Sequence, residues 1–318
     1  MRRLALAVTL FVVTCGIATA DTYPSRRITV IVPFGAGSGT DSVARIVTQP
    51  LAEKLKATIV VENRAGASGA IGAVAAARSA PDGYTLFFGG SSTQAANPSL
   101  LKSIQYDPKT DFAPIARLGL FPYIVVVHPD VQAKTIGELV ALAKQKPGTL
   151  SFAYGNALGQ LSGEMFKRRT GVDVQAIPYK STPEAVTDLL AGRVSMMFTD
   201  MTPVLSLIRS GQLRAVATIT PERSPLLSDL PSIQEQGLDY RSLSAWTGMF
   251  APKDTPADVI ARLTELLREI VADPAIKQRL AEIGFEARYI PPKEFADFVA
   301  GDIELWAAAT KEAGIERQ

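Results

Sequence analysis

The sequence is almost without cysteine and histidine. Cys15 and His128 are the single representatives of their kinds among 318 residues. A single cysteine excludes an internal disulfide. One cysteine and one histidine together are too few for the usual zinc ligand sets. His128 follows an apolar segment and precedes a proline, so we expect a structural or surface role for it. The sequence predicts no metal, no cofactor and no catalytic thiol.

An excess of one charge is also missing. The chain has 33 lysines and arginines against 31 aspartates and glutamates. A basic excess is what draws proteins to nucleic acids and to anionic membranes. We therefore expect neither nucleic acid nor a membrane surface as a partner.

The first 20 residues have the three parts of a secretory signal peptide. Arg2 and Arg3 precede an apolar run at 4–13, and Ala-Thr-Ala follows as a cleavage site. The run is shorter than the roughly 20 residues of a membrane-spanning helix. Lipid attachment at Cys15 is the alternative, but Thr14 fits poorly before a modified cysteine. The sequence predicts a soluble protein that leaves the cytoplasm after cleavage near residue 20.

The rest of the chain contains two series of predicted strands and helices. Roughly 300 residues exceed what one hydrophobic core usually holds. Strands alternating with helices predict a parallel sheet covered on both faces. Pro50 lies inside the first helix pattern, where we expect a kink or two short helices. The first series consists of strands at 27–34, 57–63 and 83–90 and helices at 41–55 and 70–79.

The second series begins with a strand at 122–130. Its first helix follows Thr135, which forms a capping pattern with Glu138. A surface connector at 220–244 leads to the last segment, where Thr255 is expected to cap a helix with Pro256 at its first position. The other predicted elements are strands at 149–156, 174–179, 194–200, 213–219 and 245–252 and helices at 160–170, 182–190, 203–209, 255–274 and 292–311.

Two α/β lobes with a ligand cleft between them account for this order. We expect a signal peptide at 1–20, lobe 1 at 21–123 plus 242–318, and lobe 2 at 124–241. The chain then crosses between the lobes twice, and strand ends and helix N-termini meet in the cleft. Closure is expected as a hinge motion at the crossings, near 120–124 and 240–248.

Glycine-rich turns separate the first two strands from their helices. Helix N-termini leave unpaired N–H groups and a positive dipole end, and glycine lets an anion approach that backbone. The turns match neither the dinucleotide fingerprint nor the lysine-containing phosphate loop, so they favour a carboxylate. The alternative is that they are only tight turns, with Asp41 and Ser42 at the helix start. The first turn comprises Phe34, Gly35, Ala36, Gly37, Ser38, Gly39, Thr40 and Asp41, and the second contains Gly66 and Gly69.

Short polar and aromatic residues also follow the other strands. They suit hydrogen bonding to a small polar ligand, although each could be only a turn or cap residue. Asp200, between a strand and a helix, could be an N-cap, a ligand contact or both. The candidates are Ser91, Ser92, Thr93, Tyr154, Gly155, Asn156, Tyr179 and Asp200.

Six segments in order resemble the substrate-binding proteins of tripartite tricarboxylate transporters, also called the Bug family. They are VPFGAGSGTDSVAR, VVENRAGASGAIGA, APDGYTLFFG, PYKSTPEAVTDLLAGRVSMMF, GQLRAVA and GMFAPKDTP. The resemblance extends over about 24–318. Two departures from the family are Pro50 in the first helix and Gln160, where many members carry histidine.

The resemblance implies a type II periplasmic binding protein of the Venus-flytrap kind. Such a protein captures a small organic carboxylate and delivers it to the permease subunits of a membrane transporter, and we expect it to be a monomer. The resemblance places one ligand carboxylate at the two glycine turns, through backbone N–H groups and ordered water. It adds Asn63, Ala67, Ser68 and Gly69 to the candidates in the first lobe. It also implies that the second lobe selects the ligand, so the candidates for specificity there are Tyr154, Asn156, Gln160, Tyr179 and Asp200.

Two other functions fit the same sequence. A periplasmic sensor partner would use the same cleft and dock a receptor instead of a permease. A secreted α/β enzyme acting on a small organic acid would need a positioned base or nucleophile with a partner. The single histidine and the absence of a thiol after residue 20 weigh against the enzyme.

Overall fold

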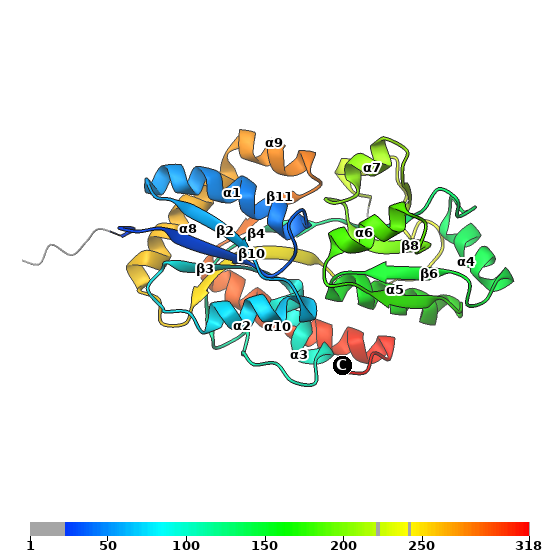
Figure 1. Ribbon diagram of the computed structural model, residues 1–318, viewed down its shortest axis with the longest axis horizontal. Helices are drawn as coiled ribbons and strands as arrows, with labels where there is room; N and C mark the ends of the chain where they lie inside the picture. Colours follow the sequence, from blue (N-terminus) through cyan, green and yellow to red (C-terminus); the bar gives the residue numbers. More distant parts are fainter. Residues whose placement is uncertain (1–22, 221–222, 241–242, 318) are drawn as a thin grey trace, which may run out of the picture.

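Two β-sheets, each flanked by helices, organise the molecule (Figure 1). The computed structural model describes residues 23–220, 223–240 and 243–317. The predicted signal peptide, with Cys15, lies outside the described residues. In the part of the chain that is described, none of the helices has both the length and the apolar composition to span a bilayer.

The first sheet has six strands in the order β11-β4-β10-β3-β1-β2. β1 pairs in parallel with β2 and β3, whereas β10 runs antiparallel to β3 and β4. The parallel pairing predicted for the first series is confirmed for β1, β2 and β3, but the sheet as a whole is mixed, because the returning chain inserts β10 in the opposite direction. The strands are β1 (Ile28–Val32), β2 (Ile59–Asn63), β3 (Thr85–Gly90), β4 (Phe112–Phe121), β10 (Ala245–Pro252) and β11 (Glu286–Ile290).

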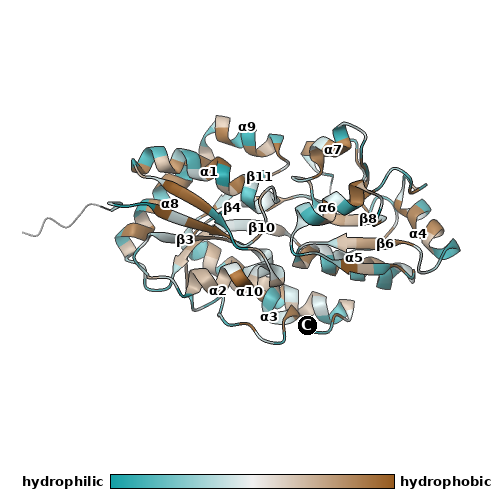
Figure 2. Ribbon diagram, viewed as in Figure 1, coloured by the Kyte–Doolittle hydropathy of each residue, from teal (hydrophilic) through white to brown (hydrophobic). Residues whose placement is uncertain are grey.

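Helices cover both faces of this sheet. α1 (Gly39–Leu55), α8 (Ala257–Ala272) and α9 (Pro274–Glu282) pack together on one face, and α2 (Ala70–Ala77), α3 (Asn97–Leu100) and α10 (Pro292–Ala313) lie on the other (Figure 1). Figure 2 shows helices such as α1 and α9 with hydrophilic and hydrophobic residues alternating along them. On α8 the apolar stripe Val259, Leu263, Leu266, Leu267 and Ile270 is buried, as the 3.6-residue period requires.

Two local predictions concern these helices. At Pro50, where a kink or two short helices were expected, the two short helices are not formed, because α1 is one helix that continues through the proline. Val47 and Leu51, both fully buried, hold the helix to the core on either side of the proline. At α8 the N-cap position is Pro256, and the Thr255 hydroxyl donates to the Pro252 carbonyl instead of capping the helix.

The second sheet has five strands in the order β7-β6-β8-β5-β9 and is also mixed. β6 is parallel to β7 and β8, and β5 is antiparallel to β8 and β9. Its strands are β5 (Tyr123–Val127), β6 (Ser151–Tyr154), β7 (Gln175–Pro178), β8 (Met196–Asp200) and β9 (Arg214–Thr218). Its helices are α4 (Ile136–Gln145), α5 (Ala157–Thr170), α6 (Thr182–Leu190) and α7 (Leu205–Arg209). The capping pattern predicted at Thr135 is confirmed, since its hydroxyl accepts the Glu138 N–H.

The chain passes between the two sheets twice, at neighbouring points. Pro122 separates β4 from β5 on the way out, and the return ends at β10. Ala245, the first residue of β10, pairs with Phe121, the last residue of β4. The second sheet with its helices is thus an insertion between two paired strands of the first.

Candidate functional site

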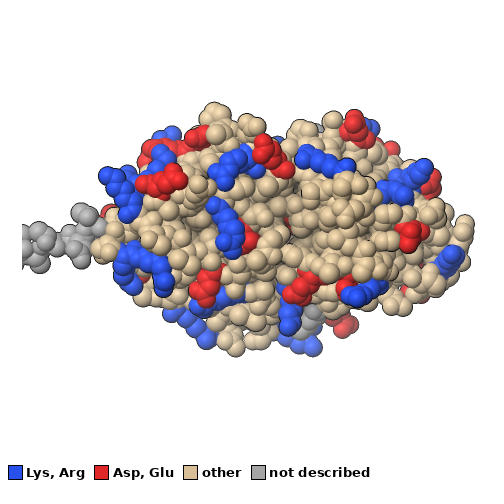
Figure 3. Space-filling view, turned by 45° about the horizontal axis from the view of Figure 1, so that its top comes forward, with Lys and Arg blue, Asp and Glu red and all other residues tan. Residues whose placement is uncertain are grey.

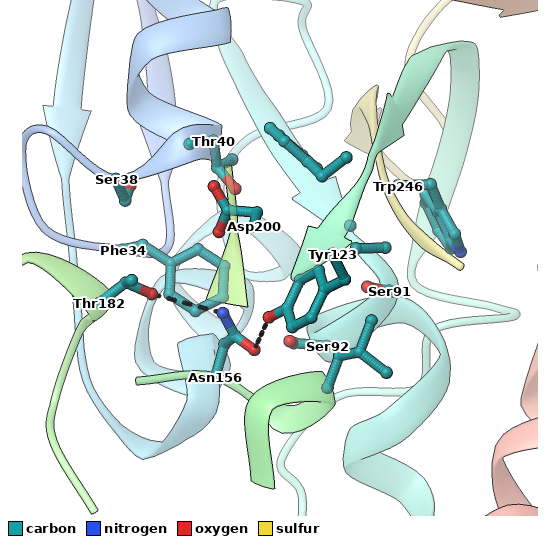
Figure 4. A pocket seen from close by; sticks show the side chains of 15 residues that line it. Phe34, Ser38, Thr40, Ser91, Ser92, Tyr123, Asn156, Thr182, Asp200 and Trp246 are labelled. Carbon is teal, nitrogen blue, oxygen red and sulfur yellow. Dashed lines mark hydrogen bonds between the residues drawn. The ribbon is translucent and has the colours of Figure 1, made fainter. Parts of the chain in front are cut away.

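A pocket lies between the two sheets, at the ends of strands from both (Figure 4). Its volume is about 40 Å³, room for about three water molecules. In this conformation the two halves of the molecule are in contact around it. The lining residues are Phe34, Ser38, Gly39, Thr40, Gly90, Ser91, Ser92, Phe121, Tyr123, Asn156, Leu158, Thr182, Asp200, Ala245 and Trp246.

The first glycine turn brings the N-terminus of α1 to the pocket. Ser38 is the N-cap, and its hydroxyl accepts the Asp41 N–H at 3.3 Å. The Asp41 carboxylate accepts the N–H of Gly37 at 2.9 Å, and Gly37 has a positive φ of 80° that favours glycine. The N–H groups of Gly39 and Thr40 begin the helix, where no intrahelical acceptor exists. The turn therefore presents backbone donors to the cavity.

Asp41 joins the two glycine turns to each other. Its Oδ1 accepts the Asn63 amide at 2.9 Å, and the same amide group donates to the Phe34 carbonyl at 2.9 Å. Arg45 Nε donates to both carboxylate oxygens at 3.1 Å. Burial pushes the pKa of Asp41 up, but these bonds outweigh it and hold the pKa below its usual value. Asp41 and Asn63 are thus supports behind the pocket wall.

The second glycine turn also lies behind the wall. Positive φ angles occur at all four of its residues, Gly66, Ala67, Ser68 and Gly69. At Ala67 and Ser68 this backbone conformation is strained, because these residues carry a Cβ atom that glycine lacks. The Ser68 carbonyl accepts the side-chain amide of Asn97 at 3.3 Å. A Cβ at Gly69 would lie 2.7 Å from the Thr93 methyl and 3.4 Å from the Phe34 ring. The turn thus backs Phe34 without bordering the cavity.

Serines at the end of β3 connect the two halves of the molecule. Ser91 and Ser92 border the pocket, and Ser92 Oγ accepts the N–H of Ala157 at 3.3 Å. Ala157 opens α5 of the second sheet, so this bond spans the cleft. Thr93 turns away, with its hydroxyl in contact with the backbone of Gly90.

The second half of the molecule supplies a chain of hydrogen bonds to the pocket. Asn156 caps α5 by accepting the Gly159 N–H at 3.0 Å, which starts the helix three residues before the predicted 160. Its Oδ1 also accepts the Tyr123 hydroxyl at 2.6 Å, and its amide donates to Thr182 Oγ1 at 3.4 Å (Figure 4). Burial raises the pKa of Tyr123 well above its usual value, so the phenol stays neutral.

Gly155 makes this arrangement possible. A Cβ there would lie 2.2 Å from the backbone nitrogen of Thr182 and 2.3 Å from the carbonyl carbon of Ser181. A side chain would push the start of α6 away from the end of β6. The glycine therefore brings Thr182 to Asn156 without lining the pocket itself.

Asp200 is the acidic residue in the pocket wall. It ends β8, is 6% exposed, and its Oδ1 is buried without a hydrogen-bond partner among the described residues. Burial raises the pKa of this carboxyl to about 6; Thr202 lies close enough to oppose the rise in part. The predicted role as an N-cap is wrong, because α7 begins only at Leu205 with Val204 at its N-cap.

The other predicted site residues lie outside the pocket lining. Tyr179 donates its hydroxyl to Asp188 at 2.7 Å, and Gln160 is buried on α5. A Cβ at Gly35 would lie 2.7 Å from Ser181 Oγ, so this glycine permits close contact across the cleft. The full set behind or beside the wall is Gly35, Ala36, Gly37, Asp41, Asn63, Ala67, Ser68, Gly69, Thr93, Tyr154, Gly155, Gln160 and Tyr179.

Several lining residues were not selected from the sequence. Tyr123 is the first residue of β5 and Thr182 the first residue of α6, and nothing in the sequence around them differs from an ordinary start of a strand or helix. Trp246 borders it too, but its indole turns away in Figure 4 and donates to Asp302 at 2.7 Å. The others are Gly90, Phe121, Leu158 and Ala245.

The chemistry of the pocket is that of neutral donors around one acid. Within the described residues no lysine, arginine or histidine lines it, and no cluster of three histidine, cysteine, aspartate or glutamate side chains forms a metal site. Positive and negative side chains are interspersed on the face shown in Figure 3. Hydroxyl and backbone N–H groups of this kind can bind a carboxylate.

Comparison with known proteins identifies a family for the chain. Residues 43–315 match the family described as Tripartite tricarboxylate transporter family receptor. The chain is 38% identical to Protein BugT of Bordetella pertussis, over 99% of this chain and 98% of BugT. An R. palustris protein solved with adipate superposes with a TM-score of 0.91 at 32% identity, covering 93% of this chain and all of the other. MatC of Rhodopseudomonas palustris with bound malate gives 0.85 at 30% identity, covering 90% and 99%.

Proposed function

The chain belongs to the tripartite tricarboxylate transporter receptor family, and on that premise we propose the role of a periplasmic solute-binding protein. It captures a small organic carboxylate in the pocket between its two lobes. It then delivers this ligand to the membrane subunits of the transporter. The relatives solved with adipate and with malate support this class of ligand.

The observation that carries the proposal is the convergence of neutral donors on one cavity. The start of α1 supplies Gly39 and Thr40, the end of β3 supplies Ser91 and Ser92, and the start of α6 supplies Thr182. A carboxylate held by N–H and O–H donors needs no lysine or arginine, because the helix N-terminus adds a positive dipole end. We infer that the first lobe binds one carboxylate group of the ligand.

Ligand exchange requires the lobes to separate. The two halves are in contact across the pocket, as in the hydrogen bond from the Ala157 N–H to Ser92 Oγ, and separating them would widen the access to it. We propose lobe 1 at 21–123 plus 242–318 and lobe 2 at 124–241, moving about the adjoining crossings near Pro122 and 240–248. Contacts made by the ligand to both lobes stabilise the closed form over the open one.

We infer binding without catalysis. Among the described residues the pocket serines have no histidine or lysine beside them, so no activated nucleophile is formed. Catalysis by a pair of carboxyls, one acting as general acid and the other as general base, would need a second acidic residue in the lining beside Asp200, and the lining contains none. We also propose that the mature chain begins near Asp21, after removal of the signal peptide, and acts as a monomer.

The test is a thermal-shift screen of residues 21–318, first freed of copurified ligand by partial unfolding and dialysis. Mono-, di- and tricarboxylates are compared at neutral pH with matched amides and alcohols of the same length. An acid at a hundredfold its Kd stabilises the protein by about 2.7 kcal/mol, a clear rise in Tm. A rise restricted to acids, with the acid recovered intact, supports the proposal. No rise with any acid contradicts carboxylate capture, and conversion of the acid contradicts the role as a binding protein.

A further inference from the structure

We propose that Asp200 accepts a hydrogen bond from the ligand, so that the preferred ligands are carboxylic acids carrying a hydroxyl or ammonium group toward the second lobe. This inference rests on the proposed function, because it assumes that a carboxylate occupies the first-lobe end of the same pocket. It narrows the ligand class from organic acids in general to hydroxy and amino acids.

The position of Asp200 leaves its carboxyl directed at the cavity. Oδ1 would lie 2.5 Å from a Cβ at Gly39, which places it against the start of α1 across the cleft. Figure 4 shows the carboxyl in the middle of the lining groups, between Thr40 and Phe34. A ligand bound at the N-terminus of α1 therefore comes within reach of Asp200.

Two neighbouring donors of the second half are already engaged elsewhere. The Tyr123 hydroxyl donates to Asn156, and the Asn156 amide is directed to Thr182. Thr202 comes near the carboxyl without a hydrogen bond of normal geometry from its hydroxyl. A buried acceptor without a donor is costly, and a ligand donor would remove that cost.

Among the described residues that line the pocket, none carries a positive charge that would compensate Asp200. The groups that face it are the neutral phenol of Tyr123 from β5, the turn at Ser38 and Gly39 before α1, and Asn156 at the start of α5. Asp41 on α1 is engaged by Arg45 and Asn63 and is absent from the lining. A second ligand carboxylate beside Asp200 would place two anions together in a buried site. The pocket thus opposes plain dicarboxylates and favours a donor.

The ionisation of Asp200 fixes the direction of the pH dependence. Burial places the pKa of its carboxyl at about 6, so it is an anionic acceptor at neutral pH and becomes protonated below pH 6. An ammonium-bearing ligand should bind more weakly as the pH falls through 6. A plain dicarboxylate should bind more tightly over the same interval, because the protonated carboxyl can donate to it.

The experiment is calorimetric titration with two series of acids that differ only in one substituent. The first is succinate, malate and aspartate, and the second is glutarate, 2-hydroxyglutarate and glutamate. We expect a substituted acid to bind the native protein at least about tenfold more tightly than its unsubstituted parent at pH 7.5. In Asp200→Asn this preference should fall to within about threefold. The control is Asp130→Asn, whose side chain is 93% exposed far from the pocket lining and should leave the preference unchanged.

The outcomes separate this inference from the proposed function. Tight binding of the parent acids, equal to that of the substituted ones and unchanged in Asp200→Asn, overturns the inference and leaves carboxylate capture intact. Absence of binding by every acid overturns both. If Asp200→Asn does not fold, the native protein decides alone: opposite pH trends for aspartate and succinate between pH 7.5 and 5.5 support the inference, and parallel trends overturn it.

Discussion

Two buried carboxyls near the cleft, Asp41 in the first half of the molecule and Asp200 in the second, have opposite surroundings. Asp41, 3% exposed, accepts from Gly37, Arg45 and Asn63, and its pKa lies below the usual value. For Asp200, 6% exposed, the oxygen Oδ1 has no hydrogen-bond partner among the described residues, and the pKa is raised to about 6. Burial raises the pKa of both carboxyls, and only around Asp41 do hydrogen bonds and the guanidinium of Arg45 outweigh that rise.

On one side of the site the buried polar groups are satisfied within the protein, and on the other side one is not. Around Asp41 the protein satisfies its own polar groups, so the two glycine turns are held in place before any ligand arrives. Around Asp200 one acceptor remains for something outside the chain. A pre-organised end costs little to bind a common group, while an unpaired end discriminates between ligands.

Asp41→Asn should cause the largest loss of stability. It would leave unpaired polar groups on the Asp41 side of the cleft, as there already are on the Asp200 side. The new amide would direct N–H groups toward the N–H of Gly37 or the guanidinium of Arg45, leaving buried donors unpaired. We expect the free energy of unfolding in urea to fall by about 3 kcal/mol at pH 7. Because the folded pKa is lowered, the advantage of Asp41 is full above about pH 4 and is lost as the pH falls below it.

Asp82→Asn is the matched control for this variant. Asp82 forms an ion pair with Arg26 in which both side chains are well exposed, so its loss should cost less than about 1 kcal/mol. Equal losses in the two variants would show that the Asp41 network does not support the turns.

Asp200→Asn should have the opposite sign and a smaller size. The folded pKa is about 6 against an ordinary 3.8, so the folded state binds more protons between these values and stability decreases as the pH rises through this interval. Removing the carboxyl should therefore stabilise the ligand-free protein by about 2 kcal/mol above pH 6. The gain should shrink toward zero near pH 4, as urea unfolding at both pH values would reveal. A loss of stability at pH 7 would mean that the carboxyl has a partner within the protein.

Ser92→Ala should give the smallest effect, because it removes one hydrogen bond between the two halves of the molecule and leaves Asp41 and Asp200 unchanged. The bond from the Ala157 N–H to Ser92 Oγ crosses the cleft and should contribute about 0.5–1 kcal/mol to closure. Ligand affinity should fall by a few-fold in calorimetry, with the Tm of the ligand-free protein almost unchanged. Ser210→Ala, at an exposed hydroxyl that bonds within its own turn, is the control. An unchanged affinity would exclude this bond from the closed form.

The fold was predictable where local pattern decides the structure. The strands of the first series and the capping box at Thr135 follow from residue type and spacing, and both are present. β4, α9 and β11 were missed. The direction of β10 could not be predicted either, because an apolar strand pattern does not specify which neighbours it pairs with or in which sense.

The site was predictable at the level of turns but not of side chains. Glycine spacing marked the start of α1, which reaches the pocket, yet it also marked the turn at Gly66 and Gly69, which supports the pocket wall from behind. Tyr123 was missed because its place depends on the Asn156 side chain, 33 residues away in the sequence. Contacts of this range arise from the packing of two sheets, and no local pattern encodes them.

The pairing of Ala245 with Phe121 also bears on how such a chain can diversify. The second sheet and its helices, which we propose discriminate between ligands, are connected to the first half next to two paired residues of β4 and β10. They can be exchanged between related chains as a cassette, with the cut points fixed by the geometry of that pair. Natural variation can likewise remodel the residues around Asp200 while the two glycine turns stay in the other half. Recombination at this junction is therefore a direct route to receptors with new ligands.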